Sequence, residues 1–300
     1  MRLVKLCTIH RGNYADVTAV QIVKHGSRGE RVAMKWAYAQ AMSNTLFPIY
    51  NRDGYQMTNA LTMMNKEIRI ILLLRDSPGI CKIKRILNGP RIARVLFAWA
   101  GVPVMVWNRE RKEYCATGGM VENLLPLKVK PAKYSIYYSE SDAFSIIKQV
   151  VCAVSVFHSM MIVHKDIKPE NVLITKSNGI ISATLCDFNS ADIVDSDGMI
   201  FDCQGTEAFS PPELFSPGKG VNGFARDMWS VGMTLYCLLF GRLPFVAESG
   251  LALQIEIMGW QLSMANSMFG TLLEGLLCRN PSQRMTADQA LDWLKSNPLA

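Results

Sequence analysis

Polar side chains of the kinds that move phosphoryl groups are concentrated in residues 164–171. This segment holds Asp166, Lys168 and Asn171, and a short apolar stretch follows it. A second carboxylate, Asp187, ends the next apolar stretch. Phosphoryl transfer requires metal ions on the phosphates, a cation beside them and a carboxylate that orients the attacking hydroxyl. The sequence offers a candidate for each of these requirements.

The segment resembles the catalytic loop of protein kinases, H-R-D-x-x-x-x-N, with Lys165 in place of the usual arginine. The resemblance implies that Asp166 accepts or orients the proton of the substrate hydroxyl and that Asn171 binds a magnesium ion. Lys168 is typical of the serine/threonine kinases and would neutralise the γ-phosphate. A surface loop without function would not match so many polar positions at fixed spacing.

Residues 185–189, L-C-D-F-N, resemble the kinase D-F-G motif, so Asp187 would be the main magnesium ligand. Asn189 replaces the glycine. Asparagine tolerates a positive φ better than other residues with a side chain, so we expect the backbone turn to survive. The alternative is a nucleotide-binding pseudokinase that acts as a scaffold or allosteric partner, and the intact Asp187 favours an active enzyme.

The strand V-A-M-K, residues 32–35, resembles the kinase strand whose lysine contacts the α- and β-phosphates of ATP. That role would fall to Lys35. Its expected partner is Glu67, on a helix predicted over residues 64–75. Each residue alone is a weak signal, and the two together support the same site.

Residues 9–17 align with the glycine-rich kinase loop G-x-G-x-x-G-x-V but keep only its middle glycine, Gly12. His10 and Ala15 stand where the outer glycines would be. Gly12 is where the backbone most needs to approach a phosphate, so nucleotide binding is expected to survive. The expected cofactors are ATP and Mg²⁺, and the adenine would lie between Val17, Ala33 and Leu173.

The elements that would position these residues fall into two groups. Residues 3–37 alternate and are rich in β-branched side chains, which predicts a small sheet. A hairpin is expected from residues 80–87 and 92–99. Later segments have helical periodicity: residues 141–159, 224–240, 268–278 and 286–295, with Ser141 and Thr286 as expected N-caps.

The resemblance implies an α+β, two-lobed protein kinase fold. A small antiparallel β-sheet lobe with one regulatory helix, about residues 1–100, would precede a larger, mainly helical lobe, residues 134–300. Residues 1–300 would form a single protein kinase domain, and 101–133 would be an insertion between the lobes and a candidate docking site for a partner.

Two segments compete for the hinge that binds adenine. Residues 113–115 resemble a kinase hinge in their residue types, but the residues just before them are too polar for a buried strand. Residues 98–100 follow a better strand and lie at a more usual distance from Glu67. We favour the second segment, and the sequence leaves both open.

Residues 205–213 resemble the end of a kinase activation segment, where Glu213 would pair with Arg284. Just upstream, residues 200–204 contain no hydroxyl side chain. We therefore expect Asp202 to pair with Lys165 and give activity without phosphorylation of this segment. The alternative is an unpaired aspartate on the surface.

Substrate and partners are suggested by further features. Glu170 lies where basophilic kinases carry a glutamate, which predicts protein substrates with serine or threonine acceptors near basic residues. The motif sequences most resemble those of the calmodulin-dependent kinase and kinase-kinase groups. No basic amphipathic helix of the kind that binds calmodulin follows residue 294.

Composition sets broader limits. The net charge is +7, but the basic residues form short clusters, so we expect no nucleic-acid partner. No apolar run reaches the length of about 18 residues that a membrane span needs. The eight cysteines are scattered without metal-ligand spacing. Reduced thiols are expected, and with them an intracellular protein of the cytoplasm or nucleus.

Overall fold

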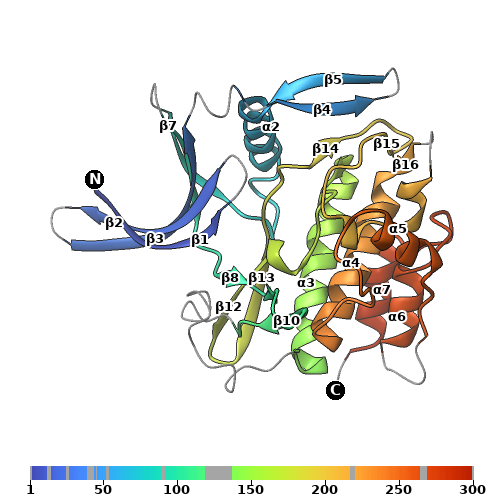
Figure 1. Ribbon diagram of the computed structural model, residues 1–300. Helices are drawn as coiled ribbons and strands as arrows, with labels where there is room; N and C mark the ends of the chain where they lie inside the picture. Colours follow the sequence, from blue (N-terminus) through green and yellow to red (C-terminus); the bar gives the residue numbers. More distant parts are fainter. Residues whose placement is uncertain are drawn as a thin grey trace.

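A computed structural model describes residues 2–11, 15–24, 27–38, 44, 46–51, 54–88, 92–118, 137–216, 220–263 and 269–298. Figure 1 shows a part that contains the N-terminus and is mainly strands, beside a part that is mainly helices. The α+β, two-lobed fold expected from the sequence is confirmed.

The smaller lobe is built on a five-stranded antiparallel sheet in the order β1-β2-β3-β7-β6. Alternating β-branched residues place one face of β2 and β3 in the interior, where Val20 and Val32 are buried. The predicted hairpin is present as β6 and β7. The strands are β1 (Arg2–Arg11), β2 (Asp16–Lys24), β3 (Ser27–Tyr38), β6 (Ile83–Asn88) and β7 (Ile92–Ala98).

Helix α2 (Ala60–Leu73) lies beside this sheet and begins one turn before the predicted start (Figure 1). The earlier start follows from Asn59, whose side chain accepts a hydrogen bond from the Thr62 amide at 2.9 Å. No element was predicted for the segment just before the helix. The structure has a hairpin there, β4 (Leu46–Asn51) and β5 (Gly54–Asn59).

The chain crosses between the lobes directly after β7. Strand β8 (Val102–Pro103) already pairs with β12 (Val172–Ser177), so the crossing occupies residues 99–101. A side chain at Gly101, where φ is 102°, would overlap the carbonyl oxygen of Ile174. Residues 98–100, the segment that the strand pattern favoured, therefore overlap the crossing.

The competing hinge candidate lies elsewhere in the fold. Residues 113–115 belong to β10 (Glu113–Ala116), which forms a hairpin with β9 (Met105–Asn108). The amide of Tyr114 donates to the carbonyl of Gly241 at 2.6 Å, so β10 is held against the helical lobe. The docking role of residues 101–133 stays a prediction, and residues 119–136 lie outside the described part of the chain.

The larger lobe packs around helices α3 and α4, both predicted. Their buried faces join one large core with α6 and α7. Ser139, not Ser141, caps α3, because its side chain accepts from the Asp142 amide at 3.1 Å and Ser141 already lies inside the helix. Thr286 caps α7 as expected. The bounds are α3 (Glu140–Ser159), α4 (Gly223–Phe240), α5 (Gly250–Gly259), α6 (Gly270–Leu276) and α7 (Ala287–Ser296).

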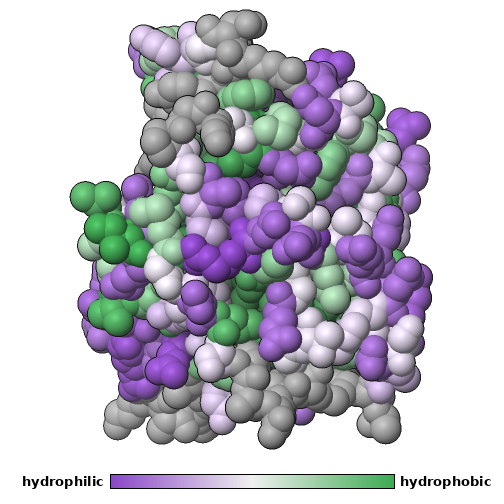
Figure 2. Space-filling view, turned by 90° about the vertical axis from the view of Figure 1, so that its right-hand side faces the viewer, coloured by the Kyte–Doolittle hydropathy of each residue, from purple (hydrophilic) through white to green (hydrophobic). Residues whose placement is uncertain are grey.

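Helix α5 was not predicted. Its apolar residues do not gather on one side, and Leu251 and Ile255 are exposed. Figure 2 faces the side where α5 and α6 lie in Figure 1 and shows hydrophilic and hydrophobic side chains interleaved, with several hydrophobic groups at its left edge. Across the described residues, no helix combines the length and apolarity of a membrane span.

Candidate active site

A buried carboxylate on α4 fixes the start of the catalytic loop. Asp227 accepts hydrogen bonds from the backbone amides of His164, at 2.7 Å, and Lys165, at 2.8 Å. His158 contacts it at 3.0 Å. Burial opposes ionisation of Asp227, but the hydrogen bonds and charges of His158 and His164 together more than offset it, so its pKa lies below the usual value. Lys165 is thereby held at a φ of 66°.

Three side chains converge on the carboxylate of Asp166. Thr206 donates its hydroxyl to Oδ1 at 2.7 Å, and Lys168 lies 2.9 Å from Oδ2. Asn171 donates to Oδ2 at 3.1 Å and to the Asp166 carbonyl at 2.8 Å. Lys168 also donates to Thr206 at 2.6 Å. The carboxylate thus accepts a hydroxyl hydrogen bond beside a cation, the arrangement that orients an alcohol for phosphoryl transfer.

Lys168 stays cationic in this setting. Burial alone would lower the pKa of its ammonium group, but the adjacent Asp166 carboxylate raises it above the usual value. A permanent positive charge therefore lies next to the acceptor hydroxyl. Such a charge stabilises the negative oxygens of a transferring phosphoryl group.

Lys35 connects β3 to α2 and to the second carboxylate. Its Nζ lies 2.8 Å from Glu67 and 3.0 Å from Asp187. The predicted pairing of Lys35 with Glu67 is confirmed. Glu67 is almost fully buried and burial raises its pKa, whereas for Asp187 the charge of Lys35 more than offsets burial and its pKa is lowered. The Asp187 side chain remains 42% exposed, open to a ligand.

The backbone turn after β13 (Ile180–Leu185) differs from the expectation. Positive φ occurs at Asp187, 62°, and Asn189 is not among the described residues with positive φ. The turn therefore does not need glycine at position 189, because the left-handed residue is the aspartate itself, a residue that tolerates this region. Phe188 is buried with its ring centroid 4.6 Å from that of His164.

The donor set fits magnesium bound together with a nucleotide. Asp187 supplies carboxylate oxygens, and Asn171, whose nitrogen is committed to Asp166, has an amide oxygen to offer. Mg²⁺ prefers oxygen ligands and is commonly held by one or two carboxylates plus substrate phosphates. Within the described residues no cluster of three or more His, Cys, Asp or Glu side chains forms a metal site by itself. Phosphate oxygens would complete the coordination.

The residues predicted to enclose adenine lie around the crossing between the lobes. Val17 on β2 is paired with Lys35 on β3, and Ala33 on β3 is paired with Phe97 on β7. Leu173 on β12 pairs with Pro103, just past the crossing. All three predicted side chains are partly accessible. Gly12 lies outside the described residues.

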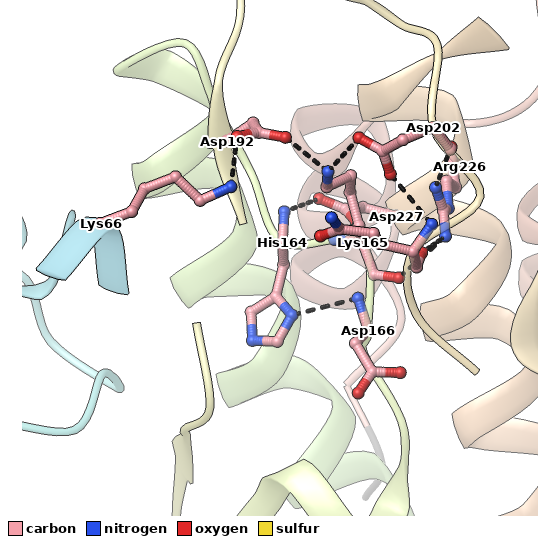
Figure 3. A network of polar contacts seen from close by, with 9 residues as sticks. Lys66, His164, Lys165, Asp166, Asp192, Asp202, Arg226 and Asp227 are labelled. Carbon is pink, nitrogen blue, oxygen red and sulfur yellow. Dashed lines mark hydrogen bonds and ion pairs between the residues drawn. The ribbon is translucent and has the colours of Figure 1, made fainter. Parts of the chain in front are cut away.

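Both pairings predicted for the activation segment are present. Arg284 contacts both oxygens of Glu213, at 2.7 and 3.0 Å. Lys165 donates to Asp202 at 2.6 Å, which excludes the alternative of an unpaired surface aspartate. Figure 3 shows that Lys165 points between two carboxylates, Asp202 and Asp192.

Sequence reasoning missed three residues of this region. Asp192 and Lys66 belong to the charged network of Figure 3, and no motif pointed to them. Tyr114 donates its hydroxyl to Glu170 at 3.0 Å, although the two residues are far apart in sequence. The sequence shows only that charged residues lie near Asp187 and near Glu67. Their order along the chain does not reveal which of them pair in the fold.

Comparisons with known proteins agree with this geometry. The family model described as protein kinase domain matches residues 5–294. Calcium-dependent protein kinase 27 of Arabidopsis thaliana is 28% identical over 77% of this chain and 45% of its own length. Serine/threonine-protein kinase TOS3 of Saccharomyces cerevisiae is 31% identical over 83% of this chain and 41% of its own.

A third relative is calcium/calmodulin-dependent protein kinase kinase cmkC of Emericella nidulans, 28% identical over 69% of this chain and 40% of its own length. The chain therefore spans less than half the length of these three relatives.

Proposed function

This chain belongs to the protein kinase family, and from that premise we propose that it is an active serine/threonine kinase that transfers the γ-phosphate of ATP to proteins. The observation that carries the proposal is the arrangement around Asp166. A hydroxyl side chain, that of Thr206, already donates to this carboxylate beside the Lys168 ammonium group. A substrate serine or threonine would take the same kind of contact.

Each residue of the site has a role in this proposal. Asp166 orients the substrate hydroxyl and accepts its proton, while Lys168 stabilises charge on the transferred group. Lys35, aligned by Glu67, binds the α- and β-phosphates. When bound with ATP, Mg²⁺ neutralises the β- and γ-phosphates, and Asn171 and Asp187 would hold it. The backbone at Gly12 would approach the phosphates, and Val17, Ala33 and Leu173 would enclose the adenine.

Transfer of radiolabelled phosphate from ATP to a basic test protein checks the proposal. We expect the wild type to be active and Asp166→Ala to lose at least about a hundredfold in kcat, as removal of a positioned acid–base group does. Asp195→Asn, which changes an exposed aspartate, is the matched control and should keep full activity. A wild type no more active than Asp166→Ala, with either Mg²⁺ or Mn²⁺, would favour the pseudokinase alternative.

We also propose a preference for basic substrates, carried by Glu170. Tyr114 holds one carboxylate oxygen of Glu170, and the other is buried without a hydrogen-bond partner among the described residues. Burial raises the pKa of Glu170. A substrate arginine or lysine would supply the missing donor and favour the charged carboxylate.

Two peptides that differ by Arg or Ala upstream of the acceptor test this preference. We expect the wild type to favour the arginine peptide by about tenfold in kcat/KM, since a hydrogen bond to a charged group is worth roughly 1.5–3 kcal/mol. Glu170→Gln should remove the preference. Glu274→Gln, an exposed glutamate on α6, should retain it. Equal rates with both peptides in the wild type would contradict the proposal.

A further inference from the structure

A row of alternating charges joins α2 to the catalytic loop and the activation segment (Figure 3). Lys66 on α2 lies 2.7 Å from Asp192, and the other oxygen of Asp192 accepts from Lys165. Lys165 also donates to Asp202 at 2.6 Å. Lys66 belongs to α2, Lys165 to the catalytic loop, and the two aspartates to the activation segment, so the row ties these three parts together.

The backbone fixes Asp192 in this position. It lies on β14 (Asp192–Ile193), which pairs with β11 (Ile162–Val163), the strand that leads into the catalytic loop. In that pairing Asp192 is opposite Val163, and the amide of Val194 donates to the carbonyl of Met161 at 2.8 Å. The carboxylate is thus held beside Lys165 by main-chain hydrogen bonds as well as by charge.

The other end of the row is equally well held. Asp202 accepts from the amide of Gln204 at 2.9 Å through its second oxygen. Arg226, fully buried, donates to the carbonyls of Asp202, at 3.3 Å, and Lys165, at 3.2 Å. A side chain at Gly205 would overlap the Lys165 carbonyl, so the segment packs tightly against the loop.

Lys165 needs both carboxylates because its side chain is fully buried. A buried ammonium group is costly unless it is paired and hydrogen-bonded. Burial disfavours ionised Asp192, but Lys165 and then Lys66 more than offset it and lower its pKa. The negative charge of Asp192 beside Lys165 is therefore already present in the unmodified chain.

Lys66 gives the row its link to catalysis, because it is adjacent to Glu67. A rigid outward shift of α2 that withdraws Glu67 from Lys35 would also separate Lys66 from Asp192. We propose that Asp192 is a positioning residue that holds α2 in place for the Lys35–Glu67 pair, and that Asp192 and Asp202 order the activation segment without phosphorylation. The inference rests on the proposed kinase function.

Hydrogen exchange of the α2 backbone amides in nucleotide-free protein tests the positioning role without relying on activity. We expect Asp192→Asn and Lys66→Met to speed exchange by about tenfold, on the order of one lost ion-pair coupling. Lys66 is partly exposed, so its variant should fold even if Asp192→Asn does not. Asp195→Asn and Arg69→Met alter exposed charges nearby and should change nothing.

The same variants separate positioning from general destabilisation. We expect Lys66→Met and Asp192→Asn to lower kcat/KM for ATP by about tenfold, with Asp192→Glu recovering most of the loss. Exchange and kinetics that match those of the two controls would overturn the positioning role. The losses from Lys66→Met and Asp192→Asn should be non-additive in the variant that carries both, because both substitutions remove the same contact.

The second half of the proposal needs protein that carries no phosphate. Chain made in bacteria, treated with phosphatase and checked by intact mass, should keep its full rate in its first turnovers. Activity that appears only after phosphorylation of the chain would overturn this half. A wild type inactive in both states would contradict the proposed function instead, and the exchange experiment would still decide the positioning role.

Discussion

Replacement of Asp227 by asparagine should be among the most damaging single changes in the chain. The carboxylate is fully buried and serves the amides of His164 and Lys165 together with the ring of His158. Asparagine has the same shape but only one acceptor oxygen. Its NH₂ group would face one of these donors, so a buried N–H would be left without a partner.

The structure gives the size of the effect. Loss of one hydrogen bond to a charged group costs roughly 1.5–3 kcal/mol, and a buried unsatisfied donor costs roughly 1–3 kcal/mol. We expect Asp227→Asn to lower the free energy of unfolding by about 3–5 kcal/mol.

The loss should depend on pH in a defined direction. The pKa of Asp227 is lower in the folded chain than the reference value of 3.8. A depressed carboxylate contributes stability above its unfolded pKa and loses it as pH falls through the folded pKa. The difference between wild type and Asp227→Asn should therefore be complete at neutral pH and shrink below about pH 4.

Urea unfolding at pH 7 and at the lowest pH where both proteins fold would measure this difference. Asp195→Asn, which removes an exposed carboxylate, is the matched control and should cost less than about 0.5 kcal/mol. The reasoning fails if Asp227→Asn loses less than about 1 kcal/mol at neutral pH, or if its loss grows as pH falls.

Three further substitutions each remove a contact of a different kind. Arg284→Met should lower the free energy of unfolding by about 3–5 kcal/mol in urea, because it strands the partly buried Glu213; a loss under about 1 kcal/mol contradicts this. Lys35→Met should reduce kcat/KM at least about a hundredfold, and preserved activity would exclude its phosphate role. Thr286→Ala should cost about 1 kcal/mol by removing the cap of α7, measured against Ser282→Ala.

The elements that the sequence predicted are those whose signals are local. Short stretches of sequence are enough to predict the hairpin of β6 and β7, the long helices α3 and α4, and the capped start of α7. The errors have local causes too. Asn59 starts α2 early through a side-chain cap that the apolar spacing does not reveal. Helix α5 lacks a single apolar side, so periodicity cannot find it.

The residues of the site also fall into those that local sequence predicts and those that only the fold brings together. Asp166, Lys168 and Asn171 lie on one short loop, so fixed spacing alone brings them together. The contact between Lys66 and Asp192 joins residues 126 positions apart. The sequence around each residue gives no sign that the other is its partner. Their meeting depends on the pairing of β14 with β11 and on the placement of α2, which only the assembled fold determines.

Lys165 shows how a departure from the family pattern can be matched elsewhere in the chain. Lysine is a compact point charge, whereas the guanidinium group of arginine is a planar fork that suits a single carboxylate or phosphate. Here the ammonium group is fully buried between Asp192 and Asp202, two carboxylates on separate segments. A small cation that donates in two directions fits that position. The lysine and its two aspartates are therefore best understood as one unit, and replacing Lys165 by arginine should impair the site although arginine is the usual residue of the family loop.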